Sequence, residues 1–176
     1  MYPGEYATTR ADKPAVIMAT SGVTLTFAEL DRRANQLAHL LRASGLRRLD
    51  HIAILMENNV RMVECCSAGE RTGVYYTCIN SYLSPDEAAY IVNDSQARIV
   101  ISSAAKRDIA VALPERCPDV ERWLMVDADG TDGAYDAYEP AVAPFPTHPV
   151  DDEQLGTAML YSSGTTGRPK GILRPL

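Results

Sequence analysis

The stretch His51-Ile52-Ala53-Ile54-Leu55, followed by a helix-like segment at residues 58–71 and then Val74-Tyr75-Tyr76-Thr77-Cys78-Ile79-Asn80, decides the fold class. The two outer segments are apolar runs of strand length. The middle segment begins with Asn58-Asn59 and is followed by Gly73, which are typical helix boundary residues. A strand, a helix and a strand in this order imply a right-handed crossover between parallel strands. The sequence therefore predicts an α/β fold, with a mainly parallel sheet flanked by helices.

Upstream of this stretch, the sequence predicts a β-hairpin followed by a long helix. The apolar runs at residues 15–19 and 23–26 flank a Ser-Gly turn signal. Thr26 and Glu29 form a capping box, which marks the start of a helix that Gly45 ends. Apolar residues repeat at helical spacing along this helix. Its opposite, polar side is expected to hold Arg32, Arg33, Asn35 and Gln36.

Downstream, the sequence predicts a further helix and two further strands. Ser84 and Glu87 form a second capping box, and the proline that follows Ser84 suits the first helical position. Strands are predicted at residues 97–102 and 122–126 because both runs are apolar and bounded by polar residues. A short helix is expected at residues 104–113.

Composition shifts divide the chain into four segments. Residues 1–14 are expected to be a loosely held polar arm, and residues 15–126 an α/β subdomain. Residues 127–154 are acidic and rich in proline, so we expect a long surface loop with few regular elements. Residues 155–176 are expected to hold a strand, at residues 157–161, and a phosphate-binding loop.

That loop belongs to the run Leu-Tyr-Ser-Ser-Gly-Thr-Thr-Gly-Arg-Pro-Lys-Gly at residues 160–171. Its glycines allow a close backbone approach, and consecutive N–H groups can form a nest for anionic oxygens. Lys170 and Arg168 add positive charge. The Walker A pattern fails because Lys170 is followed by glycine, and the dinucleotide fingerprint fails because residue 162 is serine. An ordinary Gly/Ser/Thr turn between two strands remains the alternative.

Residues 162–171 resemble the AMP-binding signature of the adenylate-forming enzymes, which include acyl-CoA synthetases, firefly luciferase and the adenylation domains of nonribosomal peptide synthetases. Two upstream runs, at residues 25–30 and 68–80, resemble the first and second core motifs of the same family. One departure is Cys78, where members usually carry proline. Another is Arg174-Pro175-Leu176, where many members have a small residue and a histidine.

The resemblance implies which residues bind the nucleotide. In the family, the signature loop grips the β- and γ-phosphates of ATP, and preorganised donors stabilise the charge on the leaving pyrophosphate. The resemblance assigns catalytic roles to Lys170 and Thr166, and no metal ligand in this chain. It assigns nucleotide binding to Ser162, Ser163, Gly164, Thr165, Thr166, Gly167, Arg168, Pro169 and Lys170.

The resemblance also implies a reaction and a limit. Family members convert a carboxylate and ATP into an acyl-adenylate and pyrophosphate, and then pass the acyl group to a thiol; the implied cofactors are ATP, Mg²⁺ and CoA. The likeness runs from about residue 15 to residue 171, which is only the opening part of a family member. We therefore expect the truncated N-terminal subdomain of an acyl-CoA synthetase-like fold, from a fatty-acid–CoA ligase, and inactive alone. The chain begins at its own Met1, which favours a CoA ligase over a peptide-synthetase domain.

Two alternatives remain open at this point. The chain could be an adenylation domain of another branch of the superfamily. It could also be a non-catalytic module that binds nucleotide phosphate or forms a homodimer through an exposed strand edge or apolar face, because a sheet cut short at residue 176 would leave such surfaces.

Composition narrows the classes of function. The chain of 176 residues is 46% hydrophobic and 23% charged, with a net charge of −6, and no basic stripe argues for nucleic acid. No run approaches the roughly 20 apolar residues of a membrane-spanning helix. The four cysteines lack metal-ligand spacing and the three histidines are scattered, so we expect free thiols in a reducing cytoplasm and no metal site.

Overall fold

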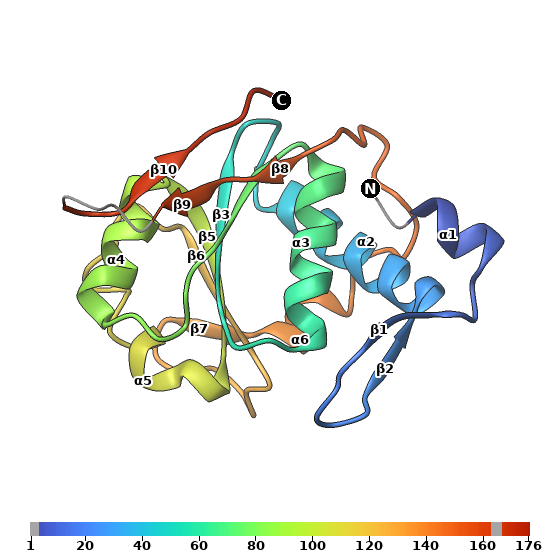
Figure 1. The fold of residues 1–176 in the computed structure, drawn as a ribbon, viewed down its shortest axis with the longest axis horizontal. Coiled ribbons are helices and arrows are strands. Elements are labelled where there is room, and N and C mark those ends of the chain that lie inside the picture. Colours follow the sequence, from blue (N-terminus) through green and yellow to red (C-terminus); the bar gives the residue numbers. More distant parts are fainter. Residues whose placement is uncertain (1–3, 163–166) are drawn as a thin grey trace.

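A six-stranded sheet runs through the centre of the computed structural model, which describes residues 4–162 and 167–176 (Figure 1). The strand order is β7-β6-β5-β3-β4-β8, and every pairing within this sheet is parallel. The predicted parallel α/β fold is therefore confirmed. The strands are β3 (His51–Leu55), β4 (Tyr75–Cys78), β5 (Ala97–Ser103), β6 (Arg122–Val126), β7 (Tyr135–Ala137) and β8 (Thr157–Ala158).

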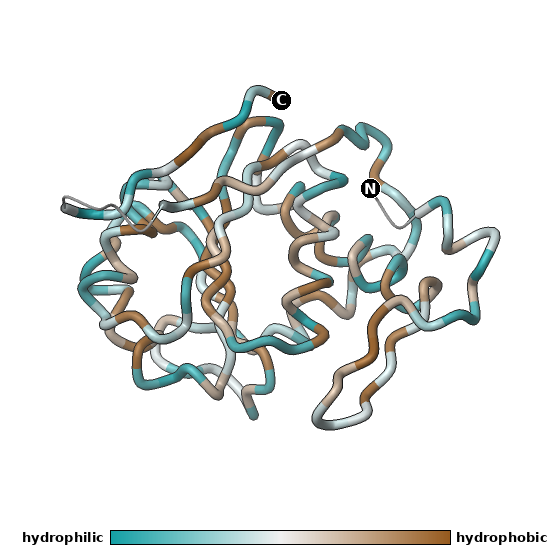
Figure 2. The backbone as a smooth tube through the Cα atoms, in the orientation of Figure 1, coloured by the Kyte–Doolittle hydropathy of each residue, from teal (hydrophilic) through white to brown (hydrophobic). Residues whose placement is uncertain are grey.

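Helices cover both faces of the sheet. Helices α2 (Phe27–Ala43), α3 (Val60–Thr72) and α6 (Tyr138–Val142) lie on one side, and α4 (Pro85–Asp94), η1 (Ala104–Lys106) and α5 (Arg107–Ala110) on the other (Figure 1). Along β3, Ile52 and Ile54 belong to one apolar cluster and Ala53 and Leu55 to the other, because side chains alternate across a strand. Burial on both faces explains why the strands are continuous apolar runs (Figure 2).

The predicted capping residues of α2, α3 and α4 are confirmed, whereas the helix predicted at residues 104–113 is shorter, because α5 ends at Ala110. Thr26 and Glu29 form a reciprocal capping box at the start of α2. Ser84 and Glu87 do the same for α4. Helix α3 ends at Gly73, whose φ of 69° is a left-handed conformation that glycine adopts without steric cost.

Two small antiparallel hairpins lie outside the main sheet. The predicted N-terminal hairpin is present, as β1 (Pro14–Ile17) and β2 (Thr24–Thr26). The strand predicted at residues 157–161 is wrong in extent. Its first part, β8, pairs with β4, but the chain then leaves the sheet edge and forms β9 (Leu160–Ser162), which pairs with β10 (Lys170–Ile172).

The N-terminal arm is more ordered than the sequence predicts. Residues Gly4–Thr9 form helix α1, and the ring of Tyr6 lies 5.3 Å from the ring of Phe27 on α2. The Arg10 guanidinium lies 5.2 Å from the Tyr6 ring. These aromatic contacts attach a polar segment to the body of the protein.

The prediction that residues 127–154 form a long loop with few regular elements is also wrong, because this segment contains β7 and α6. Tyr135 on β7 and Tyr138 on α6 are buried, and their apolar surface outweighs the surrounding prolines and acids. Strand β7 pairs with β6 and so extends the main sheet.

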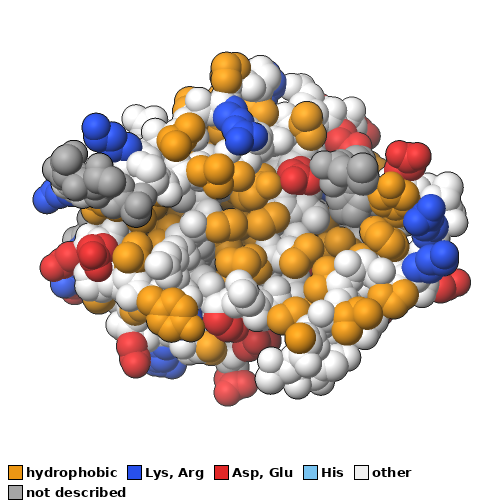
Figure 3. All heavy atoms as spheres, in the orientation of Figure 1, with side chains coloured by type: hydrophobic (Ala, Val, Ile, Leu, Met, Phe, Trp, Pro, Cys, Tyr) orange, Lys and Arg blue, Asp and Glu red, His pale blue; other side chains and the backbone are white. Residues whose placement is uncertain are grey.

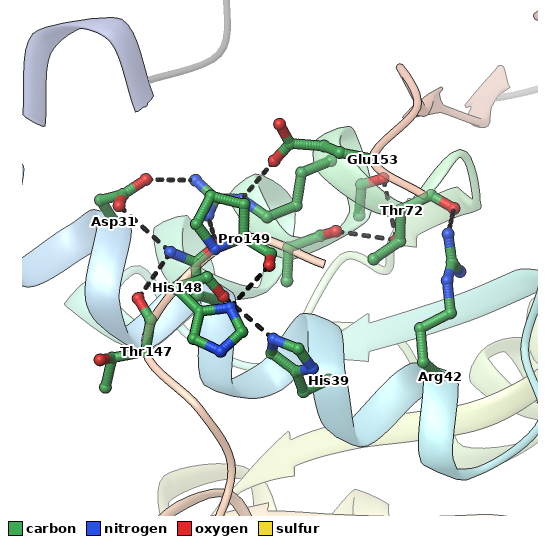
Figure 4. Close-up of polar contacts among 12 residues, drawn as sticks. Asp31, His39, Arg42, Thr72, Thr147, His148, Pro149 and Glu153 are labelled. Carbon is green, nitrogen blue, oxygen red and sulfur yellow. Dashed lines mark hydrogen bonds and ion pairs between the residues drawn. The ribbon is translucent and has the colours of Figure 1, made fainter. Parts of the chain in front are cut away.

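A buried polar network ties the rest of this loop to α2 and α3 (Figure 4). Arg71 on α3 is buried and pairs with Asp31, its Nη2 lying 2.7 Å from Oδ1. Arg71 also donates to Asn35, whose side-chain amide donates to the carbonyl of Thr147 across 2.8 Å. Asn35 is fully buried, so its predicted place on the solvated side of the helix is wrong.

Candidate phosphate-binding site

The signature run forms a β-hairpin at the edge of the molecule. Strand β9 continues from the carboxyl end of the parallel strand β8, which is where open α/β sheets usually bind ligands. The pairing of β9 with β10 places Ser162 opposite Lys170, at the two ends of the connecting loop. The sequence expectation of a turn between two strands and that of a phosphate loop are therefore both compatible with this hairpin.

Four of the predicted site residues lie outside the described part of the chain. Ser163, Gly164, Thr165 and Thr166 belong to this group, so their nucleotide contacts and the catalytic role of Thr166 remain predictions. The hairpin brings the other predicted residues together on one short segment, namely Ser162, Gly167, Arg168, Pro169 and Lys170.

Helix α4 holds the hairpin at two points. The Tyr161 hydroxyl donates to Oδ2 of Asp94 across 2.7 Å. The Tyr90 hydroxyl donates to the Pro169 carbonyl across 3.1 Å. Burial and the Asp94 carboxylate raise the pKa of the Tyr161 phenol, so this group stays protonated and remains a donor at neutral pH. Both ends of the loop are thereby attached to one helix.

Tyr90 also positions one of the two loop cations. The Arg168 guanidinium carbon lies 5.1 Å from the centre of the Tyr90 ring, within the range of a cation–π contact. Lys170, on β10, is exposed. Within residues 4–162 and 167–176, neither Arg168 nor Lys170 takes part in a salt bridge. Two cations without carboxylate partners can attract a polyphosphate.

A groove of about 430 Å³ separates the hairpin from α4. Its hairpin wall includes Arg168, but its helix wall presents the carboxylates of Asp86 and Glu87. Hydrogen bonds from Ser84 hold the pKa of Glu87 below its usual value, so this carboxylate is charged at neutral pH. The two carboxylates therefore make the helix side of this groove unfavourable for phosphate.

Sequence reasoning missed Tyr90 and Asp94 as partners of the hairpin. The sequence alone indicates for Tyr90 only aromatic bulk in the core or on the surface. Asp86, Tyr90 and Asp94 follow one another at intervals of four residues and therefore lie on one face of α4. This spacing is the only sign in the sequence that they share a face. Nothing in the local sequence indicates that the distant hairpin would pack there.

A cluster of charged side chains around the buried Glu64 lies away from the hairpin. Glu64 on α3 is buried beside a cavity of about 160 Å³, and it pairs with Arg33 across 3.1 Å and Arg61 across 2.8 Å. Burial raises the pKa of Glu64, while the two guanidiniums oppose this effect. Glu139 on α6 pairs with Arg61 across 3.2 Å, so two carboxylates balance two guanidiniums and the cluster links α2, α3 and α6.

Neither a metal centre nor a membrane span is found in the part of the chain that the structure describes. Groups of three or more His, Cys, Asp or Glu side chains that could hold a metal ion are absent there. Over the same residues, none of the helices has the length and apolar character needed to cross a membrane. We therefore assign no protein ligand to Mg²⁺.

The chain is similar to known proteins over most of its length. The sequence model of a family described as "AMP-binding enzyme" matches residues 5–175. A linear gramicidin synthase of Brevibacillus parabrevis is 33% identical over 90% of this chain, and the match covers 2% of that protein. A 3-oxocholest-4-en-26-oate–CoA ligase of Rhodococcus rhodochrous is 32% identical over 90% of this chain, and the match covers 30% of that ligase.

A solved structure has the same fold over almost the whole chain. The anthranilate CoA ligase AuaEII, in complex with anthranoyl-AMP, superposes with a TM-score of 0.86 at 25% identity. The match covers 97% of this chain and 33% of that ligase. The chain thus spans about a third of the length of the CoA ligases that it matches.

Proposed function

The chain belongs to the AMP-binding enzyme family, and on that premise we propose that it forms the N-terminal, ATP-phosphate-binding part of an ATP-dependent acyl-CoA synthetase. In the proposed reaction, a carboxylate attacks the α-phosphorus of ATP, and acyl-adenylate and pyrophosphate form. The acyl group then passes to the thiol of CoA, and AMP leaves. The observation that carries this proposal is the hairpin that sets Ser162 opposite Lys170 at the base of the signature loop.

The proposed role of the hairpin is electrostatic. Negative charge accumulates on pyrophosphate as it leaves, and fixed donors and cations aimed at that charge lower the barrier. Lys170 would contact the departing phosphates. Arg168, held over the Tyr90 ring, would supply the second cation, and Thr166 a hydroxyl donor. Ser162, Ser163, Gly164, Thr165, Gly167 and Pro169 would complete the binding loop.

We propose that this chain alone does not complete the reaction. Much of the catalytic effect in a two-substrate reaction comes from holding both substrates in reacting geometry. The described residues offer a site for phosphate, but no metal cluster, and we assign none of them to adenine, to the acyl group or to CoA. In a longer protein, the adenine, magnesium and acyl sites would be completed by residues beyond this chain.

Carboxylate-dependent exchange of labelled pyrophosphate into ATP tests this proposal. The chain alone is expected to give no exchange with a panel of fatty and aromatic acids. A longer protein that contains the chain is expected to give exchange, and Lys170→Ala is expected to lower it. Lys13→Ala is a matched control, because Lys13 is also exposed but lies in the N-terminal segment. Exchange by the isolated chain would overturn the claim that it is incomplete.

The proposal also names an acyl acceptor and a class of acid substrate. We favour CoA as the acceptor and a fatty acid as the substrate, in the cytoplasm where ATP and CoA are available. The alternative is an adenylation domain that loads a carrier protein, and it is supported by the 33% identity to a gramicidin synthase. Free CoA added to the adenylating protein distinguishes a CoA ligase from a carrier-loading domain. An acyl-CoA product supports the ligase, and its absence supports the carrier-loading domain.

A second candidate function is a non-catalytic, self-associating module. Leu160 and Ile172 of the hairpin, and Leu173 directly after it, each have about half of their surface accessible. Apolar side chains also gather across the middle of the face in Figure 3. Sedimentation over a range of concentrations tests this candidate. A dimer that Ile172→Asp dissociates supports it, and a concentration-independent monomer opposes it.

A further inference from the structure

Two of the four cysteines lie side by side, on α3 and β4. The Sγ atoms of Cys66 and Cys78 are 3.7 Å apart, within the range of a sulfur hydrogen bond. The helix–strand crossover brings them together: Cys66 on α3 packs against the apolar cluster that includes Tyr76 of β4, and Cys78 is the last residue of β4. Both belong to well-packed elements, since β4 lies between β3 and β8 and α3 packs against α2.

The other two cysteines are not available for pairing. Cys65 is fully buried in the apolar cluster between α2, α3 and the sheet. Cys117 is buried in the cluster on the opposite face, and burial raises its pKa to about 11. Cys78, in contrast, is exposed and Cys66 is half-buried, so a small reagent in solution can reach the pair.

The environment of the pair suits thiol–disulfide exchange. The hydrogen bond between the two sulfurs lowers the pKa of the Cys78 thiol, and thiolate is the nucleophile in such exchange. The same hydrogen bond, burial and the nearby Glu70 carboxylate raise the pKa of Cys66. Because Cys78 is exposed and Cys66 is half-buried, a dissolved disulfide reaches Cys78 first. Cys78 is therefore the attacking thiol, and Cys66 resolves the mixed disulfide.

We propose that Cys66 and Cys78 are a reversible redox site that closes to an intramolecular disulfide when the chain meets a small disulfide oxidant such as oxidised glutathione. The sulfurs must approach from 3.7 Å to a bond length of about 2 Å. The sulfurs are already in hydrogen-bond contact before the bond forms.

The electron balance follows ordinary exchange chemistry. The Cys78 thiolate attacks one sulfur of oxidised glutathione, forms a mixed disulfide and releases one glutathione thiolate. Cys66 then loses its proton and attacks the Cys78 sulfur, which releases the second glutathione. Two protein thiols are oxidised, one glutathione disulfide is reduced, and the two thiol protons end on the two glutathione molecules.

Closure would fasten α3 to the end of β4. Residues that follow Cys78 lead into α4, the helix that holds the hairpin through Tyr90 and Asp94. The bond would also close a loop over residues 66–78, which restricts the unfolded chain. The oxidised form is therefore expected to melt several degrees above the reduced form.

Equilibration of the whole chain with oxidised and reduced glutathione tests the site. After quenching and denaturation, the count of free thiols is expected to fall from four to two. The mass is expected to fall by that of two hydrogens, and a digest to yield a peptide pair joined through Cys66 and Cys78. Dithiothreitol is expected to restore all four thiols.

Three variants make the test specific. Cys66→Ser and Cys78→Ser are each expected to abolish the linked peptide pair. Cys66→Ser is further expected to accumulate a glutathione adduct on Cys78, because the resolving thiol is missing. Cys65→Ala is the matched control, and it is expected to form the disulfide as the unchanged chain does. Any of three results would overturn the proposal. In the unchanged chain, these are glutathione adducts without the internal disulfide, four free thiols after oxidation, or a disulfide that involves Cys65.

Discussion

Tyr161 on β9 donates a 2.7 Å hydrogen bond to Asp94 on α4, and this contact attaches the hairpin of the signature loop to a helix 67 residues away in the sequence. The bond links the edge of the molecule to an element packed on the main sheet. Its removal should therefore loosen the hairpin and leave the fold intact.

Tyr161→Phe tests that contact. Loss of a hydrogen bond costs on the order of 1 kcal/mol, which corresponds to roughly a fivefold increase in local opening. Hydrogen exchange of amides in β9 and β10 should accelerate by that factor, and exchange in β3 and β5 should not change. Tyr82→Phe is a suitable control, because Tyr82 is 88% exposed. Unchanged exchange in the hairpin would argue against the contact.

Tyr90 holds the loop in two ways, which substitutions separate. Tyr90→Phe removes the hydrogen bond to Pro169 and keeps a ring under Arg168, whereas Tyr90→Ala removes both. Protection of the hairpin amides is expected to be highest in the unchanged chain, lower in Tyr90→Phe and lowest in Tyr90→Ala, with roughly 0.5–1 kcal/mol lost at each step. Equal protection in the two variants would show that the cation–π contact contributes nothing.

The buried guanidinium of Arg71 depends on Asp31. Asp31→Ala would leave a buried cation without its closest carboxylate partner, which typically costs about 3 kcal/mol. Urea denaturation measures this change. The control is Asp86→Ala, because Asp86 is largely exposed in its pair with Arg116 and such pairs contribute about 0–1 kcal/mol. Similar losses in the two variants would contradict the network in Figure 4.

The capping box of α2 makes a prediction about pH. Hydrogen bonds from the Thr26 backbone and side chain lower the pKa of Glu29 below 4.5. A carboxyl whose pKa is lower in the folded state stabilises the fold above its unfolded pKa, and this stabilisation is lost as the pH falls through the folded value. Thr26→Ala should therefore raise the Glu29 pKa, as followed by NMR titration of its carboxyl carbon. An unchanged pKa would show that the side-chain bond is absent in solution.

Much of the fold could be predicted from local sequence patterns. The capping boxes at Thr26 and Ser84 depend on residues three positions apart, and the apolar runs of β3 and β5 signal burial on both faces. Such short-range chemistry is readable from a single sequence. The signature run indicated a loop at these residues, but the sequence did not predict the strand pairing of β9 with β10 that frames it.

The missed features all depend on contacts between distant segments. Tyr135 and Tyr138 make a strand and a helix inside a stretch that proline and acidic residues mark as loop, because the core accepts their rings. Asn35 is buried because Arg71 and the Thr147 carbonyl meet it from other parts of the chain. The contacts of Tyr90 and Asp94 with the hairpin are of the same kind.

Titration of the chain with pyrophosphate, followed by ³¹P NMR and by chemical shifts of the hairpin amides, tests most directly whether the hairpin is a phosphate site. The unchanged chain is expected to show saturable shifts centred on β9 and β10. Lys170→Ala is expected to weaken binding about tenfold, a loss of about 1.4 kcal/mol, and Lys13→Ala to leave it unchanged. Equal weakening by the two substitutions, or shifts spread over the surface without saturation, would contradict the account.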